Sequence, residues 1–238
     1  MTSSSTQVLL IKRKVLAAVA TLTIVGGVSA AATGAASAAT PQCGADCISV
    51  FSSELGSYDQ LNYVEAILGD GVARIGQPVG LKQANKFDPT QDIKPDAPVP
   101  DAKVSDFYAA AMVSAAANSH YGSLPAVQQR YAPFGTPTDL CVGLASVAQN
   151  EGLTLQPCSV PVTTVWIIHE GLATPSGYFP IINAATTDFR RPFAMHLPRN
   201  KLASGKPVQM QARRLQFLTG EKTLPARQLW GAVFGELR

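Results

Sequence analysis

The apolar positions of this chain come in short runs separated by turn-forming residues, rather than in long helical stretches. Residues 153–156 (LTLQ) alternate apolar and polar side chains, which is the period-two pattern of a half-buried strand. Gly, Pro, Asn and Thr are frequent between such runs, where they favour turns. The pattern therefore predicts a chain made mostly of short strands.

Residues 138–168 (TDLCVGLASVAQNEGLTLQPCSVPVTTVWII) hold the clearest unit of this pattern. One strand ends near Leu144, a turn follows at 149–152, and two further strands cover 153–156 and the segment that closes at 166–168. Cys141 and Cys158 lie on or beside the two neighbouring strands, so a disulfide between them would join the strands. Closing a loop of that size contributes about 3 kcal/mol in the chain-entropy model.

The same order of four strands occurs in three copies, at about 43–93, 127–168 and 178–235. The first strand of the three copies is predicted at Ile48–Phe51, Gln128–Tyr131 and Pro180–Asn183, and the second at Tyr63–Ile67, Cys141–Ala145 and Phe193–Leu197. The third is predicted at Val79–Leu81, Leu153–Leu155 and Leu215–Phe217. The fourth closes on a large apolar residue, which is Ile93, Trp166 or Trp230. The last residue of the first strand precedes the second strand by 12, 10 and 10 residues in the three copies. This regularity predicts an all-β β-trefoil of three four-strand repeats, in which a barrel of six strands is capped by three hairpins and leaves no open sheet edge. A two-sheet β-sandwich with chance spacing is the alternative.

The bulky apolar residues at recurring places in the copies are predicted to form the core. These residues are Phe51, Trp166, Phe193, Phe217 and Trp230. The three fourth-strand residues are expected to meet around a pseudo-threefold axis.

Residues 94–126 do not fit the repeat and are predicted to be an insertion between the first and second copies. Residues 94–104 are rich in Pro and Asp and indicate a link. The Ala-rich segment that follows has Ser105 as a predicted N-cap, Asp106 in the first turn and Gly122 as a stop, which favours a short helix. A strand is the alternative there, and residues 202–210 are predicted to be a smaller insertion in the third copy.

Each copy resembles the ricin-type β-trefoil lectin repeat, which carries a cysteine pair on its second and third strands and a Gln-x-Trp sequence at its fourth. Cys141, Cys158 and Trp166 match this repeat in the middle copy, and residues 228–230 (QLW) match it in the last. The first copy has QDI at 91–93, with isoleucine where tryptophan belongs. The whole chain also resembles secreted proteins of actinobacteria, a resemblance that supplies no biochemical role.

The lectin resemblance implies a sugar site made of a second-strand carboxylate, a polar amide near Gln-x-Trp and an aromatic side chain. A carboxylate accepts two hydroxyl hydrogen bonds, and a charged acceptor contributes more than a neutral one. Gly143 and Met195 occupy the implied carboxylate position in the middle and last copies, whereas the first copy has Glu65. The predicted ligand-binding residues are therefore Glu65, Asn85, Asp88, Gln91 and Tyr63, with Tyr58 as a second aromatic candidate. The alternative is that Glu65 is a surface acid on a strand.

Residues 1–39 are predicted to be a signal peptide, which leaves a single secreted, extracellular domain at 40–238. The cations at 12–14 precede an apolar run at 15–28, and residues 36–38 (ASA) form a small-x-small cleavage pattern. The run is shorter than the roughly 20 residues needed to cross a membrane, although an uncut signal anchor is the alternative. Four cysteines in an exported chain predict two disulfides, Cys43–Cys47 and Cys141–Cys158.

Removal of the three signal cations leaves 16 basic and 16 acidic residues, so the mature chain has no net basic charge and nucleic acid is an unsuitable partner. The charges are uneven, because residues 190–238 hold ten bases and two acids. A positive face is predicted from Arg190, Arg191, Arg199, Lys201, Lys206, Arg213 and Arg214. It is either an ordinary solvated surface or a patch for an acidic polymer or a phosphate-bearing wall.

The sequence carries no Gly-x-Ser-x-Gly, His-Glu-x-x-His, phosphate-loop or Gly-x-Gly-x-x-Gly motif, and its histidines are scattered. We therefore expect no catalytic residues, no cofactor and no metal. The predicted function is non-enzymatic binding of carbohydrate or cell-surface glycan by a monomer that contacts neither nucleic acid nor, after signal removal, membrane. The alternatives are a protein-binding or protease-inhibitor-like β-trefoil and a secreted hydrolase of unrecognised type.

Overall fold

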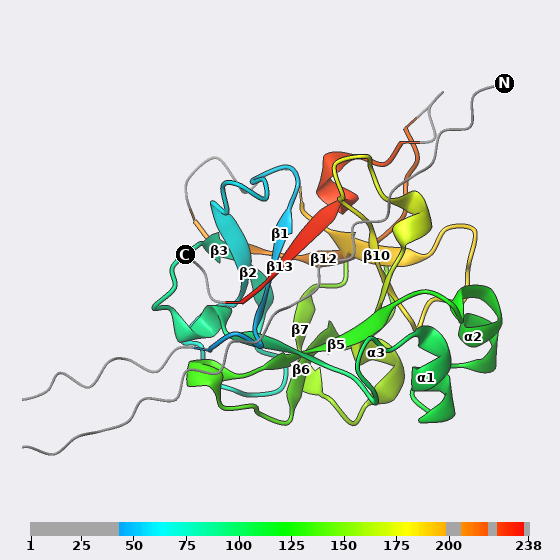
Figure 1. Cartoon of the computed structure of the whole chain (residues 1–238), viewed down its shortest axis with the longest axis horizontal. Coiled ribbons are helices and arrows are strands. Elements are labelled where there is room, and N and C mark those ends of the chain that lie inside the picture. The colour runs from blue at the N-terminus through cyan, green and yellow to red at the C-terminus, as the bar shows by residue number, and fades with distance from the viewer. Residues whose placement is uncertain (1–42, 199–205, 219–222, 236–238) are drawn as a thin grey trace, which may run out of the picture. The chain divides into compact units, whose positions relative to one another are not determined.

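A ring of six strands organises the described part of the chain. Figure 1 shows a structure made mostly of strands and loops. The computed structural model describes residues 43–198, 206–218 and 223–235, so the predicted signal peptide lies outside the described residues. The ring strands are β1 (Ile48–Ser52), β4 (Ile93–Asp96), β5 (Ala126–Tyr131), β8 (Val165–Ile168), β9 (Ile181–Asn183) and β13 (Trp230–Phe234). Each pairs with the next in that order, β13 returns to β1, and the bridge between Phe179 and Trp230 closes the remaining gap.

Three antiparallel hairpins accompany the ring, one from each copy of the repeat. They are β2 (Tyr63–Ile67) with β3 (Val79–Gln83), β6 (Leu140–Leu144) with β7 (Leu153–Pro157), and β10 (Phe193–His196) with β12 (Gln211–Arg214), while the short β11 (Val208–Gln209) pairs with β3. Backbone hydrogen bonds from Leu153 N–H to Met210 O and from Met210 N–H to Val79 O join the third strands of the three hairpins. A six-stranded barrel with three such hairpins is a β-trefoil, so the predicted fold is confirmed and the sandwich alternative is wrong.

The fourth-strand residues Ile93, Trp166 and Trp230 are fully buried in one shared apolar cluster, as predicted. Each indole N–H donates to a second-strand carbonyl, from Trp166 to Val142 at 2.8 Å and from Trp230 to Met195 at 3.0 Å. These bonds let a large aromatic side chain enter the core without leaving a polar group unsatisfied.

The third strand of the last copy differs from the prediction. It covers 211–214 rather than 215–217, and Phe217 is 47% exposed instead of buried. Val208 and Met210, which were assigned to a smaller insertion, belong to the main core. The third strand was predicted too far along the chain because the large apolar residues at 215–218 lie just beyond the strand. The small Ala212 occupies the core position instead.

The insertion forms two helices, α1 (Val104–Ala109) and α2 (Ala115–Tyr121), and not the single predicted helix or a strand. Residues 94–96, which were predicted to begin the link, belong to β4 instead, so the insertion is shorter than predicted. Ser105 lies inside α1, which begins after Lys103 and is separated from α2 by Ala111 in the left-handed backbone region. Ser114 caps α2 by accepting a hydrogen bond from Ala117 N–H, and α2 ends at Gly122 as predicted. Phe107 and Tyr121 anchor the helices in a second apolar cluster against the barrel.

In the part of the chain that the structure describes, the remaining helical segments are one short α-helix and four 3-10 turns: α3 (Pro161–Thr164), η1 (Pro89–Gln91), η2 (Pro133–Gly135), η3 (Glu170–Leu172) and η4 (Ala226–Gln228). Among the described residues, no helix is long and apolar enough to cross a membrane.

Both predicted disulfides are present, Cys43–Cys47 and Cys141–Cys158. The second joins the start of β6 to the residue that follows β7, and its Cα atoms are 4.9 Å apart. It therefore holds together the open end of the middle hairpin.

Replacing Cys141 and Cys158 together by alanine should lower the free energy of unfolding by about 3 kcal/mol, because the unfolded chain regains the freedom of a long loop. The same replacement of Cys43 and Cys47 should cost about 2 kcal/mol or less, since that loop is much shorter. Urea denaturation of both variants measures the difference. An equal loss in the two would contradict the loop-length explanation.

Candidate functional site

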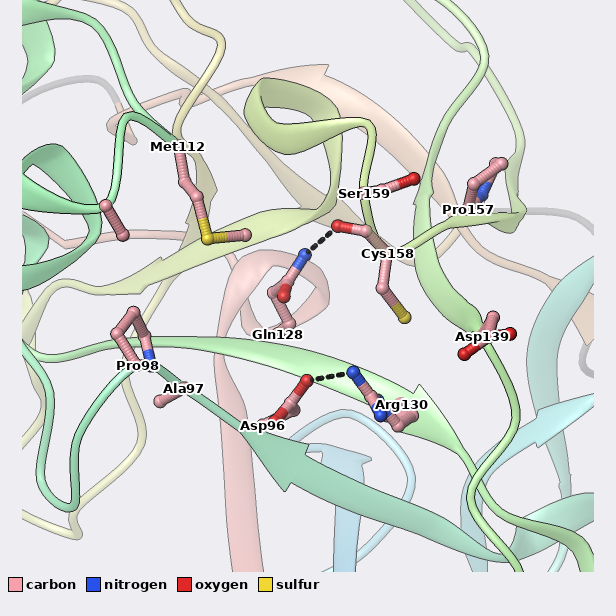
Figure 2. Close-up of a pocket in the computed structure, with 11 residues that line it drawn as sticks. Asp96, Ala97, Pro98, Met112, Gln128, Arg130, Asp139, Pro157, Cys158 and Ser159 are labelled. Carbon is pink, nitrogen blue, oxygen red and sulfur yellow. Dashed lines mark hydrogen bonds and ion pairs between the residues drawn. The ribbon is translucent and has the colours of Figure 1, made fainter.

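A pocket of about 580 Å³ lies beside the Cys141–Cys158 disulfide (Figure 2). Part of its polar lining comes from β5 and from the end of β4, which pair directly, and Asp139 before β6 adds another polar group. Residues 157–159, after β7, form another side, and Ala110 and Met112 of the insertion complete it. The pocket thus exists only where the inserted segment meets the middle repeat.

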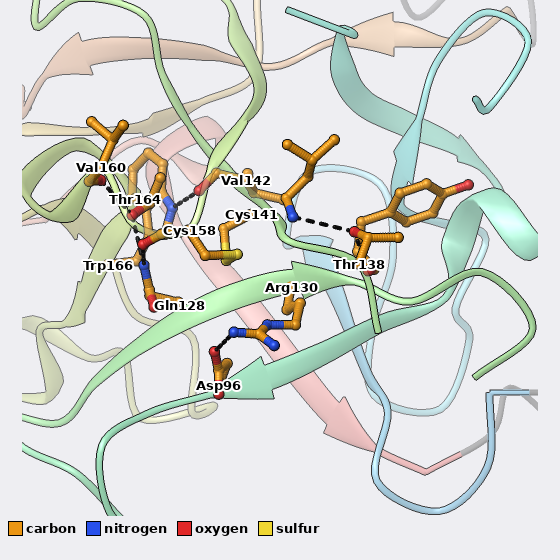
Figure 3. The surroundings of a disulfide bond; sticks show 12 residues. Asp96, Gln128, Arg130, Thr138, Cys141, Val142, Cys158, Val160, Thr164 and Trp166 are labelled. Atoms are coloured by element: carbon orange, nitrogen blue, oxygen red, sulfur yellow. Dashed lines mark hydrogen bonds and ion pairs between the residues drawn. A yellow bond between two sulfur atoms is a disulfide. The ribbon is translucent and has the colours of Figure 1, made fainter. Parts of the chain in front are cut away.

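Gln128 presents a fixed hydrogen-bond acceptor to this pocket. The side chain is 4% exposed, and its Nε2 donates to Cys158 O at 2.8 Å and to Thr164 Oγ1 at 2.7 Å (Figure 3). Thr164 in turn donates to Val160 O, so the amide is held by a connected network. Because both amide hydrogens are used, the orientation is fixed, and Oε1 accepts no hydrogen bond from the described residues.

Arg130 on β5 and Asp96 on the neighbouring strand β4 form an ion pair, with Nη2 and Oδ2 2.6 Å apart (Figure 2). Each side chain is about one-third exposed, so the pair remains accessible from the pocket. Asp139 lies on another side of the pocket, with an exposed side chain. Its carbonyl accepts the N–H of Cys158, which ties its position to the disulfide.

Acceptors therefore outnumber donors in this site. The lining holds the amide oxygen of Gln128, the carboxylates of Asp96 and Asp139 and a single guanidinium, that of Arg130, and Met112 and Pro98 add apolar surface. Such a lining suits a small ligand that donates several hydrogen bonds, and it disfavours a phosphate or another multiply charged anion.

Three of the residues predicted to bind ligand lie together, on the connection from β3 to β4. The backbone N–H of Asn85 donates to Gln91 Oε1 at 2.9 Å, and Gln91 Nε2 donates to Gln83 O at 2.7 Å. Asp88 forms an ion pair with Lys82 and accepts two hydrogen bonds from Thr90. Partial burial opposes ionisation, but these partners outweigh it and lower the pKa of Asp88. These contacts brace the connection and use the polar groups on one another.

Glu65 is buried, so it is neither accessible to a ligand, as predicted, nor the surface acid of the alternative. It is 2% exposed, and neither carboxylate oxygen has a hydrogen-bond partner among the described residues. On β2 it stands opposite Leu81, just as Val142 stands opposite Leu155 in the middle hairpin. Glu65 is therefore equivalent to the core residue Val142 and not to Gly143. The prediction was displaced by one residue, which on a strand exchanges the two faces.

The corrected register leaves no carboxylate at the position implied by the lectin resemblance. That position holds Ala66, Gly143 and His196 in the three copies. At Gly143 the space is closed, because an added Cβ would lie 2.8 Å from Thr164 Cγ2. Tyr63 is half-buried against the main core, and Tyr58 is exposed but packs edge-on against Phe51.

Sequence reasoning missed Gln128, Arg130, Asp96 and Asp139. A usable signal was present in the polar side chains at 128 and 130, which lie two apart on a strand predicted to belong to a buried barrel. The contribution of Met112 and Ala110 could not be read from the strand pattern, because it depends on how the insertion folds back.

No protein-family model matches the sequence, and no curated protein matches it. Among solved structures, a designed threefold-symmetric protein, ThreeFoil, is similar with a TM-score of 0.48 and 8% identity over 78% of this chain and 96% of that chain. A mosquitocidal holotoxin is similar with a TM-score of 0.46 and 12% identity over 80% of this chain. The match spans 17% of the toxin chain. The fold assignment rests on the strand pairing, and the resemblance to actinobacterial secreted proteins stays a prediction.

Burial raises the pKa of Glu65 to about 8, so the folded protein binds this proton more tightly than the unfolded chain does. The stabilising effect is complete below the unfolded pKa of about 4.3, decreases as pH rises, and is lost above about 8. Glu65→Gln should therefore raise the melting temperature relative to the native chain at pH 8 but not at pH 4.

Thermal unfolding across this pH range checks the expectation, with the exposed Glu170→Gln as the matched control. A difference between Glu65→Gln and the native chain that stays constant with pH would show that Glu65 does not titrate as its burial requires.

Proposed function

We propose that this chain is a secreted, non-enzymatic binding protein that holds a hydroxyl-rich saccharide, part of a cell-surface glycan, in the pocket beside the Cys141–Cys158 disulfide. The observation that carries the proposal is the buried amide of Gln128, whose oxygen is fixed and left for a ligand. An acceptor that lines a pocket and whose orientation is fixed by two donated bonds is pre-organised for a ligand, so its presence indicates binding.

The chemistry of the lining matches a neutral saccharide. Sugar hydroxyls donate to Gln128 Oε1, Asp96 and Asp139, while Arg130 donates to sugar oxygens and is held in place by Asp96. Met112 and Pro98 offer apolar contact to the C–H face of a sugar ring. The volume lies within the range of roughly 300–1,000 Å³ that small-molecule sites occupy.

A partner protein is the second candidate. Val99 and Val160 are exposed large apolar residues that directly follow the pocket residues Pro98 and Ser159 in the chain. A lysine or arginine side chain of a partner would find the carboxylates of Asp96 and Asp139 in the pocket.

Asp139→Ala should weaken glycan binding by about 10- to 100-fold, because the protein loses one charged acceptor for the hydroxyl groups of the ligand. A glycan array identifies the saccharide, and calorimetry on the purified domain measures its affinity for the native chain and the variant. Asp59→Ala removes an exposed acid elsewhere and should leave the affinity unchanged.

Affinity for a neutral saccharide should also be nearly independent of salt, whereas a basic peptide would bind less tightly as salt increases. Absence of binding to every glycan on the array, or equal effects of the Asp139 and Asp59 variants, would refute the proposal. Salt-sensitive capture of a basic peptide that Asp139→Ala abolishes would favour the second candidate.

A further inference from the structure

A cluster of arginines surrounds the turn between β9 and β10, away from the strands that line the pocket. We call it the arginine turn and define it by Asp188, Arg190, Arg191 and Arg214. Asp188 Oδ1 accepts the backbone N–H groups of Arg190 at 3.1 Å and Arg191 at 3.2 Å, while Oδ2 accepts Arg214 Nη1 at 2.8 Å. A single carboxylate thus shapes the turn and holds the third arginine beside it.

Arg214 is fixed from three sides. Besides the bond to Asp188, its Nη1 donates to Arg191 O at 3.0 Å, and its guanidinium lies 4.6 Å from the centre of the Phe193 ring. Its side chain remains about one-third exposed, so part of the guanidinium faces solvent. The arginine is therefore already oriented before any partner arrives.

Arg190 and Arg191 are exposed, and neither guanidinium forms a hydrogen bond or an ion pair with a described residue. Both oxygens of Asp188 are engaged, so the acid of the turn is occupied. Three cations face one anion here, although the mature chain is predicted to be neutral overall. Attraction for an anionic partner is consequently local to this turn.

Among the described residues, the positive face expected from sequence is divided between the two sides of β12. Arg213 alternates to the other side of β12 from Arg214 and approaches His196, with Nη1 and Nε2 3.4 Å apart. Arg199 and Lys201 lie outside the described residues.

We propose that the arginine turn binds the phosphate groups of a phosphate-bearing cell-surface polymer, independently of the saccharide pocket. The guanidinium presents a planar fork of donors that matches a phosphate in bidentate geometry, which a lysine ammonium does not. The guanidinium groups of Arg190 and Arg191 have no partner among the described residues, and that of Arg214 is already oriented. Together at one turn they can bind successive phosphates of a flexible polymer, or share one phosphate. The acceptor-rich pocket, in contrast, would repel them.

Long-chain inorganic polyphosphate is the probe, and fluorescence anisotropy against the purified domain is the measurement. The native chain should bind it with an affinity that falls as salt rises. Arg190→Ala combined with Arg191→Ala should weaken binding at least 10-fold and reduce the slope of log affinity against log salt by about 2. The control, Arg74→Ala with Lys86→Ala, removes the same charge from other exposed loops and should change little.

Asp188→Ala separates a built site from general attraction, because it makes the protein more positive while removing both oxygens that shape the turn and hold Arg214. We expect it to weaken polyphosphate binding, and tighter binding would overturn the proposal. Equal losses in the arginine and control variants, or binding to phosphatidylglycerol vesicles without binding to polyphosphate, would also overturn it. Asp139→Ala should leave polyphosphate binding unchanged, so this result and that for the saccharide pocket are read separately.

Discussion

The burial of three fourth-strand side chains in one shared centre is the constraint on which the rest of the structure depends. Ile93, Trp166 and Trp230 come from segments far apart in sequence and enter the same apolar cluster. Each indole also bonds a second-strand carbonyl, so the barrel and its hairpins are joined inside the core. Loops and insertions can vary outside this centre because the closed ring of strands does not need them for pairing.

The first copy shows how a repeat tolerates divergence. Ile93 replaces the tryptophan of the other copies, and Glu65 replaces the apolar Val142 and Met195 opposite the third strand. The copy with the smaller fourth-strand residue, Ile93, is thus also the copy with a buried carboxyl, that of Glu65, which has no partner among the described residues. Burial favours its neutral form, and the proton on Glu65 becomes part of the folded state.

Periodicity predicted the approximate places of the ring strands and two of the three hairpins, because alternation and turn residues are local properties of the chain. It placed two strand ends wrongly, since β4 and β13 begin at Ile93 and Trp230 and were predicted to end there. Periodicity could not fix the register of the strands, and an error of one residue assigned Glu65 to the ligand-binding face although it lies in the core. In the last copy, Phe217 attracted the strand assignment although Ala212 fills the core. The candidate pocket was only partly within reach: Gln128 and Arg130 left a signal in their spacing on one strand, whereas Met112 joins them only through the folding of the insertion onto the middle repeat.

The bond from Gln128 to the carbonyl of Cys158 links the pocket to the crosslink between Cys141 and Cys158. Without the crosslink, residue 158 would be held beside β6 by its backbone hydrogen bond to Asp139 and by the pairing of β6 with β7. The covalent bond therefore adds a restraint to the residue that orients the Gln128 amide, so the crosslink bears on the geometry of the pocket as well as on stability.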